Sequence, residues 1–117
     1  MTLGETAKLF SAHYIWRATG AKIAGRALIA GLSSSDANNR LIAGMFLTRG
    51  GRKAVPLFGE ALARGAPSPL LLRVIGDSGA REFESVLEGY AAGPDARLVQ
   101  AATDALRLLR LADGVGS

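Results

Sequence analysis

Residues 53–62 read Lys53-Ala54-Val55-Pro56-Leu57-Phe58-Gly59-Glu60-Ala61-Leu62, and a similar apolar helical stretch recurs as residues 81–90. Aligning Gly51 with Gly79 sets an offset of 79 − 51 = 28 positions. This offset pairs apolar positions: Val55 with Phe83, Phe58 with Val86 and Leu62 with Tyr90. One such repeat cannot bury its apolar face alone, so repeated helical hairpins stack and share a core. We therefore expect these residues to form equivalent core layers of an all-α helical-hairpin solenoid.

Glycine, proline and serine residues divide the rest of the chain into about six helices. The helices are predicted over residues 4–18, 21–32, 36–48, 52–64, 80–92 and 95–111, with a further short helical segment at 69–75. Pro56 falls in the first turn of its helix, where a missing amide hydrogen costs little. Apolar residues follow helical spacing and β-branched residues are few, so we expect no sheet.

The length of 117 residues is typical of one domain. We assign residues 1–112 to a single α-helical repeat domain and residues 113–117 to a flexible C-terminal tail. The absence of cysteine excludes disulfides and thiolate metal sites and fits a reducing cytoplasm. The first residues lack the features of a secretory signal, and the apolar run at 27–32 is too short to span a bilayer. We expect a soluble, cytoplasmic protein without membrane insertion.

The pattern Lys53-Ala54-Val55-Pro56-x-Phe58-x-Glu60-Ala61-Leu62, preceded by a glycine turn, resembles the second helix of a known repeat. The family is that of the short bacterial HEAT repeats named after phycobilisome lyases. The segment Val74-Ile75-Gly76-Asp77 resembles the end of the first helix of such a repeat, although Gly79-Ala80 lengthens the following turn. The resemblance covers residues 36–93 and extends into 95–111. It implies a short HEAT-like solenoid in which Asp77 caps the following helix.

The sequence offers little support for catalysis. His13 is the only histidine, which excludes a two-histidine metal motif, and we expect it to be structural and partly buried. Glu84 and Glu88 lie four positions apart, but Arg81 nearby makes them typical of a solvated helix face. Neither glycine-rich phosphate-binding motif is present. We therefore predict a protein that is not an enzyme and that has no cofactor and no metal.

The N-terminal helix carries more apolar surface than one core-facing stripe requires. Exposed aromatic clusters are typical of interfaces, so four residues are candidates for protein binding: Phe10, Tyr14, Ile15 and Trp16. The alternative is that they belong to the core. The leading hypothesis is a non-catalytic protein–protein interaction domain acting as an adaptor, scaffold or assembly factor. Its partner is another protein of unknown identity, and a second copy of this chain is one candidate.

The charge of the chain supports an alternative function. The formal net charge is +4 and the sequence pI is about 10.1, which favours an acidic partner or a nucleic-acid backbone. The candidate nucleic-acid-binding residues lie near two turns: Arg49, Arg52, Lys53 and Arg81. The alternative is thus a nucleic-acid-binding helical repeat module that uses a basic turn-side patch. Scattered basic residues are more often solvated surface, so a protein partner is preferred.

Overall fold

Helices begin where the sequence supplies capping groups. The computed structural model describes residues 3–65 and 67–116, with side chains for 3–65 and 67–111. The carboxylate of Asp36 accepts a hydrogen bond from the Asn38 amide at 2.8 Å, one residue before α3 (Ala37–Arg49). The Ser68 hydroxyl accepts one from the Leu71 amide at 3.1 Å and so caps α5 (Pro69–Asp77). These bonds satisfy amides that have no partner inside the helix.

The all-helical prediction is confirmed, but residues 3–65 and 67–116 form seven α-helices rather than six. The segment expected to be short, 69–75, is a complete nine-residue helix. The described residues contain no strand. Besides α3 and α5, the elements are α1 (Leu3–Thr19), α2 (Lys22–Gly31), α4 (Val55–Ala63), α6 (Glu84–Ala91), α7 (Ala96–Gly116) and two 3-10 helices, η1 (Gly51–Ala54) and η2 (Arg81–Phe83).

The last helix is longer than the sequence suggested. Its backbone continues to Gly116, beyond the expected end at Leu111. The predicted tail at 113–117 is therefore helical as far as Gly116, while Ser117 lies outside the described residues. The flexibility of this tail and the domain boundary stay predictions. No helix in the described ranges is long and apolar enough to cross a membrane.

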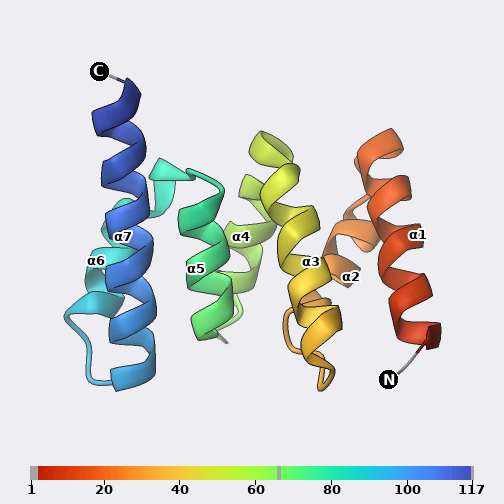
Figure 1. Ribbon diagram of the computed structural model, residues 1–117, viewed down its shortest axis with the longest axis horizontal. Coiled ribbons are helices and arrows are strands. Elements are labelled where there is room, and N and C mark those ends of the chain that lie inside the picture. Colours follow the sequence, from red (N-terminus) through yellow and green to blue (C-terminus); the bar gives the residue numbers. More distant parts are fainter. Residues whose placement is uncertain (1–2, 66, 117) are drawn as a thin grey trace.

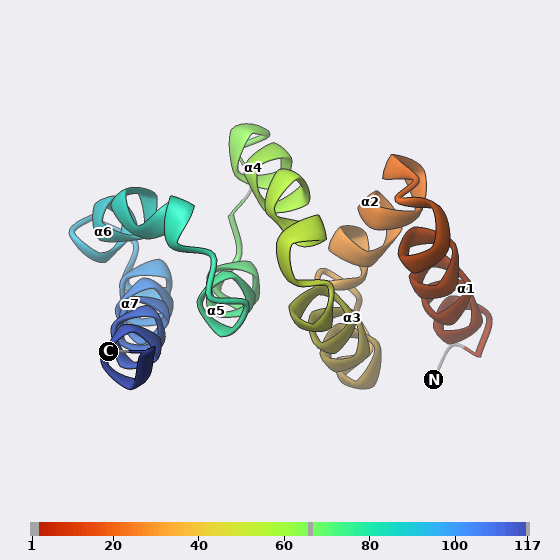
Figure 2. The same ribbon diagram turned by 90° about the horizontal axis from the view of Figure 1, so that it is seen from above.

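The helices form two layers along the longest axis of the molecule. The odd-numbered helices α1, α3, α5 and α7 lie side by side and run in the same direction (Figure 1). The shorter helices α2, α4 and α6 return on the other side of the row (Figure 2). Contacts follow this order, because α1 packs on α2 and α3, α3 on α5, and α5 on α7. The row measures 38 × 31 × 23 Å.

The two internal hairpins differ by one residue in their turns. Gly51 and Gly79 both adopt a positive φ, +58° and +70°, which glycine reaches without a steric penalty. After Gly79 the chain inserts the buried residue Ala80 before the next 3-10 turn. Helix α6 therefore starts 84 − 55 = 29 positions after α4, not 28.

Because of this inserted residue, the predicted pairing of Phe58 with Val86 in one core layer is wrong. Phe58 is fully buried, but Val86, its partner at an offset of 28, is 41% exposed. The fully buried counterpart is Leu87, one residue later. Phe58 still meets the second hairpin, because its ring lies edge-on to Phe83 at a centroid distance of 6.2 Å. Partly buried residues complete this region: Val55, Leu62, Phe83 and Tyr90.

Small residues close the contact between α5 and α7. Ala101, Ala102 and Ala105 on α7 are all fully buried. A Cβ atom added to Gly76 on α5 would lie 2.6 Å from the Ala105 Cα and 3.0 Å from its carbonyl oxygen. The backbones of the two helices thus meet with no room for a further atom.

Candidate protein-binding surface

Trp16 belongs to the core. Its side chain is only 2% exposed, and it packs against the residue that follows α3. A Cβ atom on Gly50 would lie 2.2 Å from the Trp16 ring, so the indole fills the space that a side chain at position 50 needs. Because Trp16 is buried, it cannot contribute to a binding surface as the other three candidate residues can. Trp16 therefore packs the C-terminal end of α1 against the C-terminal end of α3.

Phe10 and Tyr14 lie on the side of α1 that faces α3. The Phe10 ring meets Phe46 of α3 edge-on at a centroid distance of 5.2 Å and is half-exposed. The His13 ring stacks on the Phe46 ring, with a centroid distance of 3.8 Å and an interplanar angle of 11°. Tyr14 is 68% exposed and lies 5.4 Å from His13. These rings form a half-exposed aromatic group between α1 and α3.

Ile15 points in another direction. It lines a groove of about 450 Å³ between α1 and α2, together with Ile23 and a series of alanines. Helix α1 therefore separates the four sequence candidates into a core residue, an aromatic pair beside α3, and one residue at the end of the row. The structure does not bring them together into one surface.

A second groove, which the sequence analysis missed, runs between α3 and α5. Its volume is about 320 Å³, and its apolar lining includes Leu41, Met45, Leu70 and Val74. Leu41 is 72% exposed, although it lies in the middle of a helix whose opposite side is buried in the core. The signal available in the sequence was the pair Leu41 and Met45, four positions apart and therefore on one side of a helix. We call this feature the α3/α5 groove.

The predicted basic patch is rearranged. Arg52 forms an ion pair with Glu82, and this pair lowers the pKa of the Glu82 carboxyl. Lys53 turns toward α1, where its Nζ donates to the Arg17 carbonyl oxygen at 2.9 Å. Arg49 is exposed and borders the α3/α5 groove. Arg81 lies exposed in η2, in the turn before α6.

A basic corner replaces the predicted patch. We define it as Arg17, Arg49 and Lys53, which lie at the ends of α1 and α3 and in η1. Burial first, and then the positive charges of Arg17 and Arg49, lower the pKa of His13. Arg17 was not singled out from the sequence because it is 32 positions away from Arg49 along the chain (49 − 17). Its place in the corner depends on α1 and α3 lying side by side.

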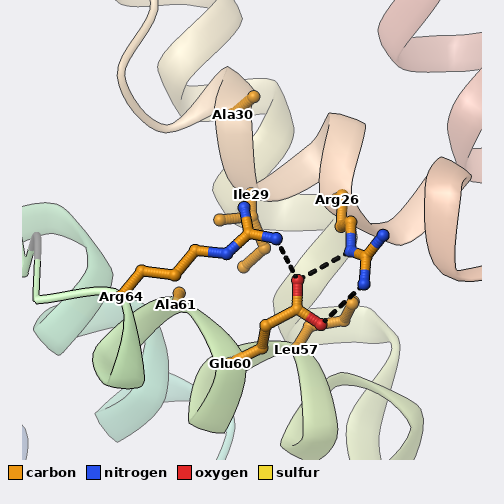
Figure 3. A pocket seen from close by; sticks show the side chains of 7 residues that line it. All are labelled: Arg26, Ile29, Ala30, Leu57, Glu60, Ala61 and Arg64. Carbon is orange, nitrogen blue, oxygen red and sulfur yellow. Dashed lines mark hydrogen bonds and ion pairs between the residues drawn. The ribbon is translucent and has the colours of Figure 1, made fainter.

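A small pocket between α2 and α4 is already filled by charges of opposite sign. Glu60 accepts two hydrogen bonds from Arg26, at 2.7 and 3.2 Å, and pairs with Arg64 at 3.0 Å (Figure 3). The bond to Arg26 is the main reason why the pKa of Glu60 is lowered. The pocket measures about 130 Å³. This arrangement ties the two helices together and leaves Glu60 ionised, without a free group for acid or base chemistry.

Charge is divided unequally along the row. Residues 1–54 contain eight Lys and Arg against two Asp and Glu, a formal charge of +6. Residues 55–117 contain six against eight, a formal charge of −2. The basic corner and the α3 side of the groove lie in the positive half. In the described parts of the chain, no three His, Asp or Glu side chains gather as metal ligands would.

Comparison with known proteins adds no family to these observations. No family model matches the chain, and neither the curated proteins nor the solved structures yielded a match.

Proposed function

We propose that the protein is a non-catalytic protein-binding domain that acts as an adaptor, scaffold or assembly factor in the cytoplasm. The observation that carries this proposal is the α3/α5 groove. Leu41, Met45 and Leu70 line the groove with apolar side chains from two helices, and Leu41 is 72% exposed. A concave apolar site bordered by polar residues is typical of binding surfaces. The aromatic group of Phe10 and Tyr14 lies on the neighbouring helix α1 and extends the candidate surface.

We also infer that the two-layered row is a short HEAT-like solenoid of helical hairpins. This inference is supported by the positive-φ glycines Gly51 and Gly79, each of which lies at or just before a 3-10 turn that leads into a second helix. A solenoid offers a long surface to a partner, which suits a scaffold. An experimental structure in which α3–α4 and α5–α6 fail to superimpose would contradict the inference.

One observation favours a second function, nucleic-acid binding. The positive charges of Arg17 and Arg49 act on His13, whose ring centroid lies 5.4 Å from that of exposed Tyr14. Cationic side chains near an aromatic ring suit a phosphate backbone with a stacked base. Such binding weakens steeply with salt, because each neutralised phosphate releases counterions. The pairing of Arg52 with Glu82 leaves fewer free cations for this purpose than the sequence suggested.

Site-specific photo-crosslinking tests the first proposal directly. A photoreactive phenylalanine analogue replaces Leu41 in the groove or, as a matched control, Val86 on α6, which is also an exposed apolar residue. The full chain is irradiated in the cells that make it, and the crosslinked products are identified by mass spectrometry.

We expect one discrete protein adduct from position 41 and none from position 86. Adducts to nucleic acid alone would favour the second function. Equal labelling from both positions, or no adduct from position 41, would contradict a binding role for the α3/α5 groove.

A further inference from the structure

We infer that the occupant of the α3/α5 groove is an amphipathic helix with acidic residues along one side. This inference rests on the proposed protein-binding function and names the chemistry of its partner. It combines the shape of the groove with the position of the basic corner at one end.

The length of the groove fits the apolar stripe of a helix. On α3 the lining includes Leu41 and Thr48, which are seven positions apart, or about 10.5 Å at the rise of an α-helix. Helices that bind in grooves anchor themselves through residues at i, i+3 or i+4, and i+7, which span the same distance. Leu41, Met45 and Leu70 offer those anchors an apolar surface.

The charges along the groove are one-sided. Arg40 and Arg49 stand at its two ends on α3, whereas the α5 side contributes Asp77. The Arg40 guanidinium donates to the Ser34 carbonyl oxygen at 2.7 Å, which holds it in place without neutralising its charge. An occupant with Asp or Glu beside its apolar stripe therefore pairs with α3 and avoids Asp77.

The basic corner extends this positive edge past the end of the groove. Arg17, Arg49 and Lys53 have no carboxylate partner among the described side chains, although Lys53 bonds to a carbonyl. Complementary charges at the border of an apolar site steer a partner and fix its orientation more than they add raw affinity. The acidic residues of the occupant should thus concentrate at the end that meets this corner.

The experiment uses the full chain to select binders from a displayed library of helical peptides. Each peptide is about 14 residues long, which is about four helical turns. The peptides carry a fixed Leu stripe at i, i+4 and i+7, and the flanking positions are randomised between Glu, Lys, Gln and Ala. Peptides that also bind the Leu41→Glu protein are removed. The best peptide is then titrated against the Arg17→Glu/Arg49→Glu protein and against Lys8→Glu/Lys22→Glu. The control pair changes net charge equally and is also exposed.

We expect Glu to be enriched on one flank. The Arg17→Glu/Arg49→Glu change should weaken binding at least about tenfold, with little change for the control pair. A peptide with Lys in place of the selected Glu should recover affinity for the doubly reversed protein. This rescue shows that the variant is folded and that charge pairing is the cause.

Other outcomes separate the two proposals. Groove-dependent peptides without Glu enrichment, or with equal affinity for both reversed proteins, would overturn the acidic occupant and leave the protein-binding function standing. No peptide sensitive to Leu41→Glu would overturn both. A homodimer in sedimentation that Leu41→Glu dissociates, or DNA or RNA binding that Arg17→Glu/Arg49→Glu abolishes, would assign the surface to that occupant and overturn this inference.

Discussion

The α1–α3 contact and the α5–α7 contact join parallel helices of the same layer in opposite ways. Large rings fill the first: Trp16 is buried against Gly50, while Phe10 and His13 meet Phe46. The second is built from Gly76 and the buried alanines of α7, so the backbones touch. Rings hold helices apart and leave their own edges exposed, whereas small residues close the contact completely. The half-exposed aromatic group of Phe10 and Tyr14 accordingly lies at the α1 end of the row.

The largest effect should come from the aromatic contact. Trp16→Ala removes a buried indole and is expected to lower the free energy of unfolding by about 3 to 5 kcal/mol. Urea denaturation followed by circular dichroism measures this change. A loss below about 0.5 kcal/mol, as for a surface residue, would show that Trp16 does not anchor α1 to α3.

In the α5–α7 contact, adding one methyl group should be enough to destabilise the fold. Gly76→Ala places its Cβ against the Ala105 backbone, which cannot move aside as a side chain can. We expect a destabilisation of about 1 to 3 kcal/mol by overpacking. Gly89→Ala is the matched control, because no atom lies within 4 Å of its added Cβ, and it should stabilise α6 by about 0.5 to 1 kcal/mol. Equal effects of both changes in thermal unfolding would refute the tight contact.

The aromatic contact should also respond to pH. The folded protein holds the pKa of His13 below its ordinary value, chiefly by burial and further by Arg17 and Arg49. Above about pH 6.5, the usual histidine pKa, His13 is neutral in both states and has no effect. At lower pH the unfolded chain takes up the proton first, so stability is lost.

The measurement compares the free energy of unfolding of the wild type with that of the His13→Gln variant, whose residue 13 cannot titrate. Between pH 7 and 5 the wild type should lose more stability than the variant, by no more than about 1.4 kcal/mol per pH unit for one proton. The other groups titrate equally in both proteins and cancel in the difference. If stability changes with pH in the same way for both proteins, the aromatic contact does not lower the pKa of His13.

The smallest effect should come from the exposed part of the same contact. Tyr14→Ser changes a side chain that is 68% exposed, so unfolding should shift by no more than about 0.5 kcal/mol. If Tyr14 belongs to the binding surface, photo-crosslinking at position 41 should nevertheless decrease. A stability loss comparable to that of Trp16→Ala would place Tyr14 in the core.

Helix positions could be predicted from the sequence because their signals are local. Asp36 and Ser68 cap the helices that follow them, and glycines end others. The repeat alignment failed at Val86 because the extra turn residue Ala80 rotates α6 by one position, and a helix moved by one residue turns a different side to the core. Gly79-Ala80 marks a longer turn in the sequence, but how that turn rotates the next helix depends on packing.

The candidate surface was harder to predict because it depends on which helices become neighbours. Phe10, Tyr14, Ile15 and Trp16 are close in sequence, but successive helical positions point in different directions, so they cannot share one face. The α3/α5 groove and the basic corner join residues from separate helices, such as Met45 with Val74. Such groupings follow from packing, which no local pattern specifies.

The contact between α5 and α7 has a consequence for how this sequence can change over time. Alanine and glycine have no side-chain rotamers to lose on folding, so burying them costs no side-chain entropy. They also have no side-chain freedom with which to accommodate a neighbour, and any larger residue at Gly76 must push two backbones apart. Substitutions of the exposed rings Phe10 and Tyr14 have open space beside them, unlike changes at buried Trp16. Evolutionary drift should therefore reshape the surface near α1 and α3 while the interior positions of α5 and α7 stay nearly fixed.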